Sequence, residues 1–297
     1  MLCFHLYRRG ANILPNFKPY IELIRLPNCL MMGLAVIVGV IISDPHYLLM
    51  YSSLDRLAFG FFTSFFLTAS SMVLNDYADR EIDKINEPRR PIPSGRMRPD
   101  VALRYGVFLG ALGISCSLAT GPLTFAIALL TFSIALLYNF KLKKSGILGN
   151  ASVAYSVAIP IVYGSVLSFS LSEKVLIYSA MIFLSIMGRE VVKGISDVEG
   201  DAAKGVRTVA VKYGEKSASY IALALFLAAV SLSFIPPIEK MCNSAFYLPF
   251  VLITDGMLFF LSVKLIKKPD KKTAKEVKSK ALIAMAFGLI GFALGSL

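Results

Sequence analysis

The sequence predicts an all-α fold, a bundle of nine membrane-spanning helices. Of its 297 residues, 56% are hydrophobic and the mean hydropathy is +0.67, whereas soluble domains average roughly 45–50% apolar residues. The excess lies in stretches of about 20 residues, which is the length of helix that crosses a ~30 Å hydrocarbon core. Because the backbone inside lipid must be satisfied within a helix or a closed barrel, such continuous runs indicate helices.

The apolar stretches divide the whole chain, and we expect residues 1–297 to form a single transmembrane domain. Its central cavity is expected to open near the cytoplasmic side. The predicted spans are Tyr20–Ile42, Leu57–Tyr77, Val101–Ser117, Leu123–Tyr138, Gly149–Ser168, Val175–Ser196, Ser219–Phe234, Phe246–Leu265 and Ala281–Gly295.

The distribution of basic residues predicts the orientation in the membrane. With the N-terminus in the cytoplasm and the C-terminus outside, only Arg56, Lys174 and Lys240 of the 31 Lys and Arg fall in outer loops. Inverting the chain would violate the positive-inside rule. The sequence thus predicts a multi-pass protein of the cell membrane, and its net charge of +12 is a topology signal. The nine spans exclude a basic soluble protein that binds nucleic acid.

Histidine and cysteine offer little chemistry in this chain. His5 and His46 are the only histidines, and the four cysteines form no CxxC or Cys/His cluster. This composition argues against a Ser-His-Asp triad and against a histidine-ligated metal.

A first cluster of carboxylates closes the second predicted span. In a helix, Asn75, Asp79 and Asp83 are spaced i, i+4, i+8 and share one stripe. Asp76 lies beside that stripe. Like charges on one stripe repel each other, and near a membrane interior they also carry a desolvation cost.

A second cluster closes the sixth predicted span with the same spacing. Asp197 and Asp201 are again i, i+4, and Glu190, Lys193 and Lys204 project near the same face if the helix continues. A hard divalent cation among these acids would remove the cost of both clusters, and Mg²⁺ takes carboxylate oxygens together with substrate phosphate. The alternative is a solvated inner face neutralised by nearby basic residues, which two matched clusters make less favourable.

Basic and aromatic residues accompany the acids at the inner boundary. Arg89 and Arg90 lie in a proline-rich stretch that favours a stiff loop, and guanidinium groups bind phosphate in a bidentate manner. Tyr138 precedes Lys141 and Lys143. These residues are candidates for stabilising an allylic cation and for binding diphosphate, or they anchor the chain at the interface.

Two further polar residues lie near the inner end of the first span, Arg25 and Asn28. An ionisable residue in a membrane segment is a candidate functional residue, although Arg25 could instead extend its charge to the interface. The lysine-rich stretch 264–280 is interpreted as a contact with anionic membrane lipids.

Together these motifs resemble the UbiA superfamily of intramembrane prenyltransferases. The resemblance rests on Asn75-Asp76-x-x-Asp79-x-x-x-Asp83, on 89–95 and on Asp197-x-x-x-Asp201, and the nine-span layout agrees. It implies transfer of a prenyl group from an isoprenyl diphosphate to a lipid-like acceptor with two Mg²⁺ ions. It implies metal ligation by Asn75, Asp79, Asp83, Asp197 and Asp201, with Asp76 as a further catalytic candidate. The implied substrate-binding residues are Arg25, Asn28, Arg89, Arg90, Tyr138, Lys141 or Lys143, Arg189, Glu190, Lys193 and Lys204.

Segments 138–150 and 189–201 are most similar to those of archaeal members that attach a geranylgeranyl chain to geranylgeranylglyceryl phosphate in ether-lipid synthesis. One departure is Gly194, where many relatives carry an acid. The alternatives are an aromatic acceptor such as 4-hydroxybenzoate, a cation-coupled transporter and an inactive scaffold. Transporter sites usually lie near the bilayer midplane, whereas these acids lie at the ends of the spans.

Overall fold

The computed structural model describes residues 17–203 and 205–297, and Lys204 therefore lies outside the described residues. Within them, nine helices are long and apolar enough to cross a membrane, which confirms the predicted number. They are α2 (Leu26–Ser43), α3 (Leu54–Ala78), α5 (Pro99–Leu118), α6 (Pro122–Phe140), α7 (Ile147–Leu167), α8 (Glu173–Ser196), α11 (Glu215–Ser233, extended by the short α12, Ile235–Ile238), α13 (Ser244–Lys267) and α14 (Lys271–Leu294).

Shorter helices connect these spans, and no strand occurs in either described range. The α-helices among them are α1 (Lys18–Ile24), α4 (Arg80–Asn86), α9 (Val198–Ala203) and α10 (Val209–Tyr213), and the 3-10 helices are η1 (Pro45–Leu49), η2 (Tyr51–Ser53) and η3 (Leu142–Lys144).

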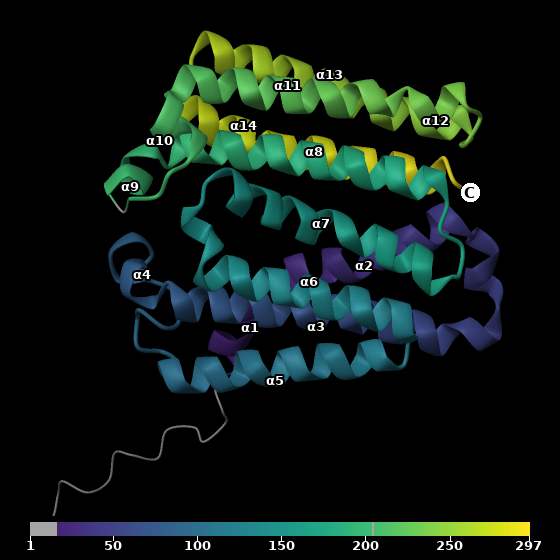
Figure 1. Cartoon of the computed structure of the whole chain (residues 1–297), viewed down its shortest axis with the longest axis horizontal. Coiled ribbons are helices and arrows are strands. Elements are labelled where there is room, and N and C mark those ends of the chain that lie inside the picture. Colours follow the sequence, from purple (N-terminus) through teal and green to yellow (C-terminus); the bar gives the residue numbers. More distant parts are fainter. Residues whose placement is uncertain (1–16, 204) are drawn as a thin grey trace, which may run out of the picture.

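The long helices run side by side along one direction (Figure 1). α2 packs on α7, α3 on α5, α8 on α11 and α13 on α14, while α7 joins the two halves by packing on α8. The connecting helices α4, α9 and α10 lie together at one end of the bundle, and the C-terminus lies at the opposite end (Figure 1).

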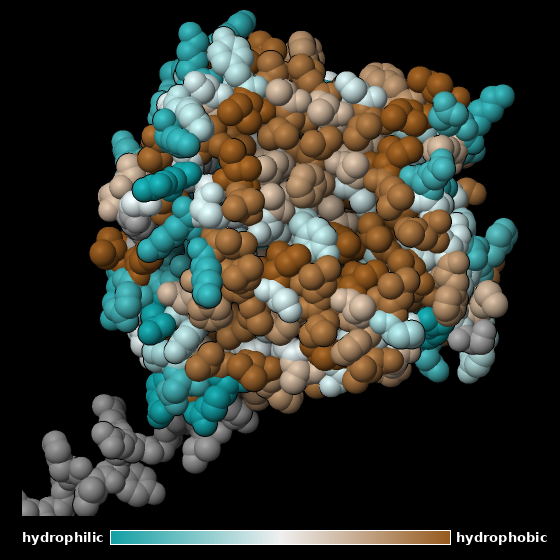
Figure 2. Space-filling view, viewed as in Figure 1, coloured by the Kyte–Doolittle hydropathy of each residue, from teal (hydrophilic) through white to brown (hydrophobic). Residues whose placement is uncertain are grey.

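The surface has the banding of a membrane protein. A broad hydrophobic band covers the middle of the molecule, and hydrophilic residues gather at its two ends (Figure 2). Large apolar side chains such as Phe260 and Leu130 are more than half exposed within the spans. Lipid rather than water would cover such a surface.

The first predicted span, Tyr20–Ile42, is wrong as a single helix. The chain breaks at Arg25 into α1 and α2, because Arg25 takes a left-handed backbone conformation with φ of 52°. That region is unfavourable for a residue with a side chain and is held only where other contacts stabilise it. The break places the Arg25 side chain against α3, where it contacts Asp76.

Two glycines allow α2 and α7 to cross closely. A Cβ atom added at Gly164 would collide with the backbone carbonyl of Val36, and one at Gly39 would collide with the carbonyl of Ile161. Small residues of this kind let membrane helices approach through their backbones. This crossing fixes the spacing of two of the helices that line the cavity described below.

Replacing Gly164 by alanine should therefore destabilise the protein. The new methyl group meets backbone that cannot rotate away, and overpacking typically costs roughly 1–3 kcal/mol. The matched control is Gly256→Ala in α13, where an added Cβ has nothing within 4 Å. Melting in detergent should show a lower transition temperature for Gly164→Ala only, and equal stability of the two variants would contradict the close crossing.

Candidate active site

A cavity of about 760 Å³ lies between the two halves of the bundle and receives residues from both predicted motifs. Its body is apolar and formed by α2, α3, α6, α7, α8 and α14. Its polar wall contains many of the residues predicted from the sequence. These are Arg25, Asn28, Asn75, Tyr138, Lys143, Arg189, Glu190 and Lys193.

The first acidic motif sits on a helix that is interrupted at one residue. α3 ends at Ala78, Asp79 forms a turn and α4 begins at Arg80. The amide of Asp79 still donates to the carbonyl of Asn75, and the amide of Asp83 donates to that of Asp79, at 2.9 and 2.8 Å. The helical spacing predicted for the three residues is therefore preserved through the turn.

The second motif repeats this arrangement in the other half of the chain. α8 ends at Ser196, Asp197 forms the turn and α9 begins at Val198. The amide of Asp201 donates to the carbonyl of Asp197 at 2.9 Å, and the hydroxyl of Ser196 donates to the carboxylate of Asp197 at 2.8 Å. Each motif thus ends a span with an acid at the turn into a short helix.

Two arginines neutralise the buried acids of the first motif. Asp76, which is 3% exposed, accepts from Arg25 at 2.7 Å and from Arg90 at 3.2 Å. Arg90 also donates to Asp83 at 2.7 Å. Burial raises the pKa of the Asp83 carboxyl, while the adjacent Arg90 guanidinium opposes this effect. The network attaches the proline-rich loop after α4 to the ends of α1 and α3.

Lys143, and not Lys141, is the lysine at the cavity. Its ammonium group contacts the carboxylate of Asp79, whereas Lys141 is exposed. The side-chain amide of Asn75 donates to Asn139 at 3.0 Å. That bond orients the amide of Asn75 and fixes the side that carries its oxygen.

On α8, a carboxylate lies between two cations. Glu190 accepts from Arg189 at 2.7 Å and lies 3.6 Å from Lys193. The Nε atom of Arg189 is buried and has no hydrogen-bond partner. A buried polar atom of this kind is costly unless a ligand or water satisfies it. This wall of the cavity is therefore suited to an anionic group.

Tyr138 lines the same cavity as residues from both motifs. It lies there together with Asn75 of α3 and with Glu190 and Lys193 of α8. The end of α6 thus contributes an aromatic ring to the polar wall.

Several predicted residues stand back from the cavity lining. Asp79, Asp83, Asp197 and Asp201 belong to the turns and short helices beside it, and Asp76 is enclosed by arginines. Arg89 is exposed, and its carbonyl oxygen accepts from Arg96.

Sequence reasoning missed Asn139 and Ser196, which hold Asn75 and Asp197 in place. Both are polar residues at the end of a predicted span, directly beside a motif residue. That position is the signal by which they could have been found.

The oxygen ligands at the two turns fit a hard divalent cation. Carboxylates and an amide oxygen are the donors that Mg²⁺ accepts in proteins. Over residues 17–203 and 205–297, however, no group of three or more His, Cys, Asp and Glu side chains is gathered tightly enough to hold an ion by itself. An ion bound here would thus rely on substrate oxygens or water, and Lys143 would have to leave Asp79.

This fold and site define a class of integral membrane protein in which a charged wall adjoins an apolar cavity. The chain belongs to the UbiA prenyltransferase family, whose model matches residues 32–292. It is 36% identical over 280 residues to a digeranylgeranylglyceryl phosphate synthase of Archaeoglobus fulgidus, covering 93% of this chain and 94% of that relative.

Solved structures show the same architecture. A structure described as digeranylgeranylglyceryl phosphate synthase is 34% identical, covers 94% of this chain and 98% of its own, and superposes with a TM-score of 0.79. A UbiA homolog from Archaeoglobus fulgidus bound to GPP and Mg²⁺ is 16% identical, covers 94% of this chain and 100% of its own, and gives a TM-score of 0.67. The second likeness concerns the fold alone. The protein is therefore a membrane prenyltransferase.

The Asp76→Asn variant should release the loop between α4 and α5. Breaking a buried ion pair costs roughly 3–5 kcal/mol, and the loss here should be smaller, about 1–3 kcal/mol, because both arginines reach solvent. Trypsin should then cut faster within residues 87–98. The control, Asp100→Asn, removes a surface carboxylate paired with Arg98 and Arg104 and should change neither cleavage nor melting. Identical digestion of both variants would contradict the role of Asp76.

Proposed function

We propose that the protein transfers a geranylgeranyl group from geranylgeranyl diphosphate to geranylgeranylglyceryl phosphate, a step of archaeal ether-lipid synthesis. The observation that carries this proposal is the cavity itself. It joins a wall of cations and acids to a long apolar body, which is the shape and chemistry of a lipid with a phosphorylated head. The names of the relatives and of the matching structure support the same substrates.

The donor diphosphate binds beside the first motif in this proposal. Arg25 and Asn28 on the α1–α2 break and Lys143 after α6 provide positive and polar groups on one side of the cavity. Lys143 exchanges its contact with Asp79 for one with the diphosphate. Arg90 holds Asp76 and Asp83 in place, and the exposed Arg89 and Lys141 are proposed as outer phosphate contacts. Lys204, which follows the second motif in the sequence, is proposed as a further phosphate contact.

Asn75, Asp79 and Asp83 would hold one Mg²⁺ ion, and Asp197 and Asp201 a second. When bound, the ions would stabilise the negative charge that develops on the leaving diphosphate. The hard oxygen ligands of both turns support this assignment, as does the Mg²⁺ bound to the UbiA homolog of the same fold.

The chain's own residues then protect the reacting centre. The allylic C–O bond breaks and leaves a carbocation, which the face of Tyr138 stabilises as a cation–π contact. The apolar walls keep water away from this cation. The hydroxyl of the acceptor attacks, and its proton passes to a carboxylate or to the released diphosphate.

Both substrates enter from the lipid in this proposal. Met31 of α2 and Ile283 of α14 line the cavity and remain 55% and 54% exposed, and the wall between these helices is the proposed entrance. The acidic turns and the lysine-rich start of α14 lie at the same end of the bundle. This end is proposed to face the cytoplasm, with the N-terminus inside and the C-terminus outside.

The substrate proposal is tested by the choice of acceptor. Purified protein with Mg²⁺ and geranylgeranyl diphosphate should prenylate geranylgeranylglyceryl phosphate and leave 4-hydroxybenzoate unmodified, as followed by mass spectrometry of the products. The cationic wall at Arg189 and Lys193 accounts for this preference because it matches a phosphate. Turnover of the phenol alone would refute the proposal in favour of an aromatic prenyltransferase.

Changing Asp79 or Asp197 to alanine should abolish prenyl transfer while the protein remains folded. Loss of one group that stabilises developing negative charge costs roughly 10²–10³ in rate, and loss of a metal ligand should cost at least as much. Turnover should fall more than substrate affinity.

The control for both variants is Asp100→Ala, which removes an exposed acid outside both motifs. Rates and melting temperatures should be measured for all three proteins. Near-normal activity of Asp79→Ala and Asp197→Ala would mean that these acids form only a solvated face.

A further inference from the structure

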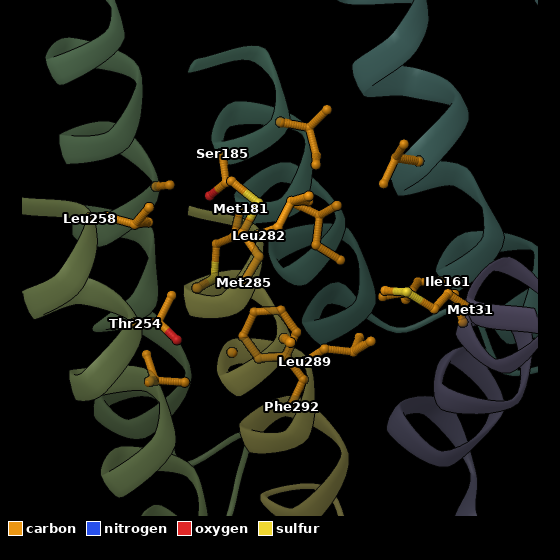
Figure 3. Close-up of a pocket in the computed structure, with 18 of the residues that line it drawn as sticks. Met31, Ile161, Met181, Ser185, Thr254, Leu258, Leu282, Met285, Leu289 and Phe292 are labelled. Carbon is orange, nitrogen blue, oxygen red and sulfur yellow. The ribbon is translucent and has the colours of Figure 1, made fainter. Parts of the chain in front are cut away.

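A second, smaller pocket of about 140 Å³ lies next to the main cavity, and Figure 3 shows the residues that line it. It is formed mainly by α8, α13 and α14, with further residues from α2, α7 and α11. Met31, Ile186 and Leu282 line both spaces, so the two adjoin. We call this space the side pocket.

The interior of the side pocket is apolar. Two of its three polar lining groups are engaged elsewhere, since the hydroxyl of Thr254 donates to the carbonyl of Ala284 and the carboxylate of Asp255 accepts from Ser233. The third is the hydroxyl of Ser185, and the remaining lining is apolar. The side pocket is therefore suited to a hydrocarbon chain, which reaches it from the adjoining main cavity in this proposal.

One face of α8 connects the charged wall at Arg189 to the side pocket. Arg189 and Ile186 line the main cavity, and Ile186, Ser185, Ile182 and Met181 line the side pocket. These positions are separated by three or four residues, which places them in one stripe along the helix. A ligand held at Arg189 by its head can follow this stripe into the pocket with its tail.

One wall of the side pocket is rigid and the others are adaptable. Phe292 forms the rigid wall (Figure 3), since its ring stacks on that of Tyr178 with ring centroids 4.1 Å apart. Met181 and Met285 form other walls, and methionine adjusts readily to different shapes. An apolar cavity of roughly 150 Å³ accommodates benzene, so the side pocket has room for about one isoprene unit.

A second path leads from the first motif along α3. Asn75, Ser71, Leu67 and Thr63 follow one face of α3 along the main cavity. That path ends at Tyr163, whose hydroxyl is hydrogen-bonded to Thr120 at 2.7 Å. One path thus follows α3 from the first motif, and the other follows α8 from Arg189.

We infer that the side pocket binds the terminal isoprene unit of the acceptor's prenyl chain and so selects the length of the acceptor. This inference rests on the proposed function, in which two long prenyl chains occupy the site together. The acceptor carries a single phosphate, which suits the two cations on α8 and the unpartnered Nε of Arg189. The donor chain follows the α3 path from the diphosphate at Lys143.

The test fills the side pocket from α8. Ser185→Phe should lower kcat/KM at least about tenfold for the geranylgeranyl acceptor, because one methylene in a filled apolar pocket already changes selectivity by roughly 10–200-fold. The farnesyl acceptor, one isoprene unit shorter, should be used as well as by the unmodified protein. The KM for geranylgeranyl diphosphate should not change.

The matched control narrows the other channel. Leu67→Phe on α3 should raise the KM for the donor and leave the acceptor-length profile unaltered. A second variant works in the opposite direction: Met285→Ala enlarges the side pocket and should improve use of an acceptor that is one isoprene unit longer. Melting in detergent identifies any variant that has not folded.

The outcomes distinguish a failure of the inference about the side pocket from a failure of the proposed function. An equal loss for both acceptor lengths in Ser185→Phe, or a loss that falls on the donor, would overturn the inference while wild-type turnover stands. If Ser185→Phe does not fold, an unchanged acceptor profile in Met285→Ala would overturn it. Failure of the proposed function would instead appear in the wild-type protein, as no turnover of any glycerol phosphate ether, and would remove the ligand proposed here.

Discussion

The structure depends on neutralising carboxylates that stand at the ends of membrane spans. Asp76 is almost completely buried and is tolerated because Arg25 and Arg90 both contact it. An isolated ion at such a place would carry a penalty of several kcal/mol. The requirement explains two costly features, the left-handed backbone at Arg25 and the stiff loop that brings Arg90 back over α3.

Both halves of the chain place acidic residues at the end of a span by the same local structure. In each half, a span ends, one aspartate forms a turn and a short helix follows, with Asp79 before α4 and Asp197 before α9. The turn takes the acid out of the apolar layer while the backbone hydrogen bonds keep it in register with the span. The cavity lies beside the two turns, and α6 and the following η3 bring Tyr138 and Lys143 to its wall.

The sequence was sufficient for features that are encoded locally. Spans follow from runs of hydropathy, so their number was predicted correctly, and the helical spacing of the acids follows from i, i+4 periodicity. Boundaries were less accurate where a helix continues into charged residues: α14 begins at Lys271, well before the predicted Ala281. Features set by tertiary contact were not accessible. The sequence around Arg25 does not predict a helix break, because the residue that Arg25 contacts, Asp76, is distant in sequence. The choice of Lys143 over Lys141 depends on how the chain turns after α6, and the side pocket is formed by six separate helices.

The charged side chains of the cavity are already paired with one another, and this pairing affects the free energy of substrate binding. A diphosphate and its cations entering this cavity do not bring charge to an uncharged site; they exchange partners with Lys143, Asp79 and the cations on α8. Because a paired charge is costly to bury and costly to strip of its partner, such an exchange is close to balanced for the head groups. The net affinity must then come chiefly from burying the prenyl chains, at about 25 cal/mol per Å² of apolar surface. Selectivity among substrates should accordingly reside in the apolar channels, while the charged wall determines which head group can react.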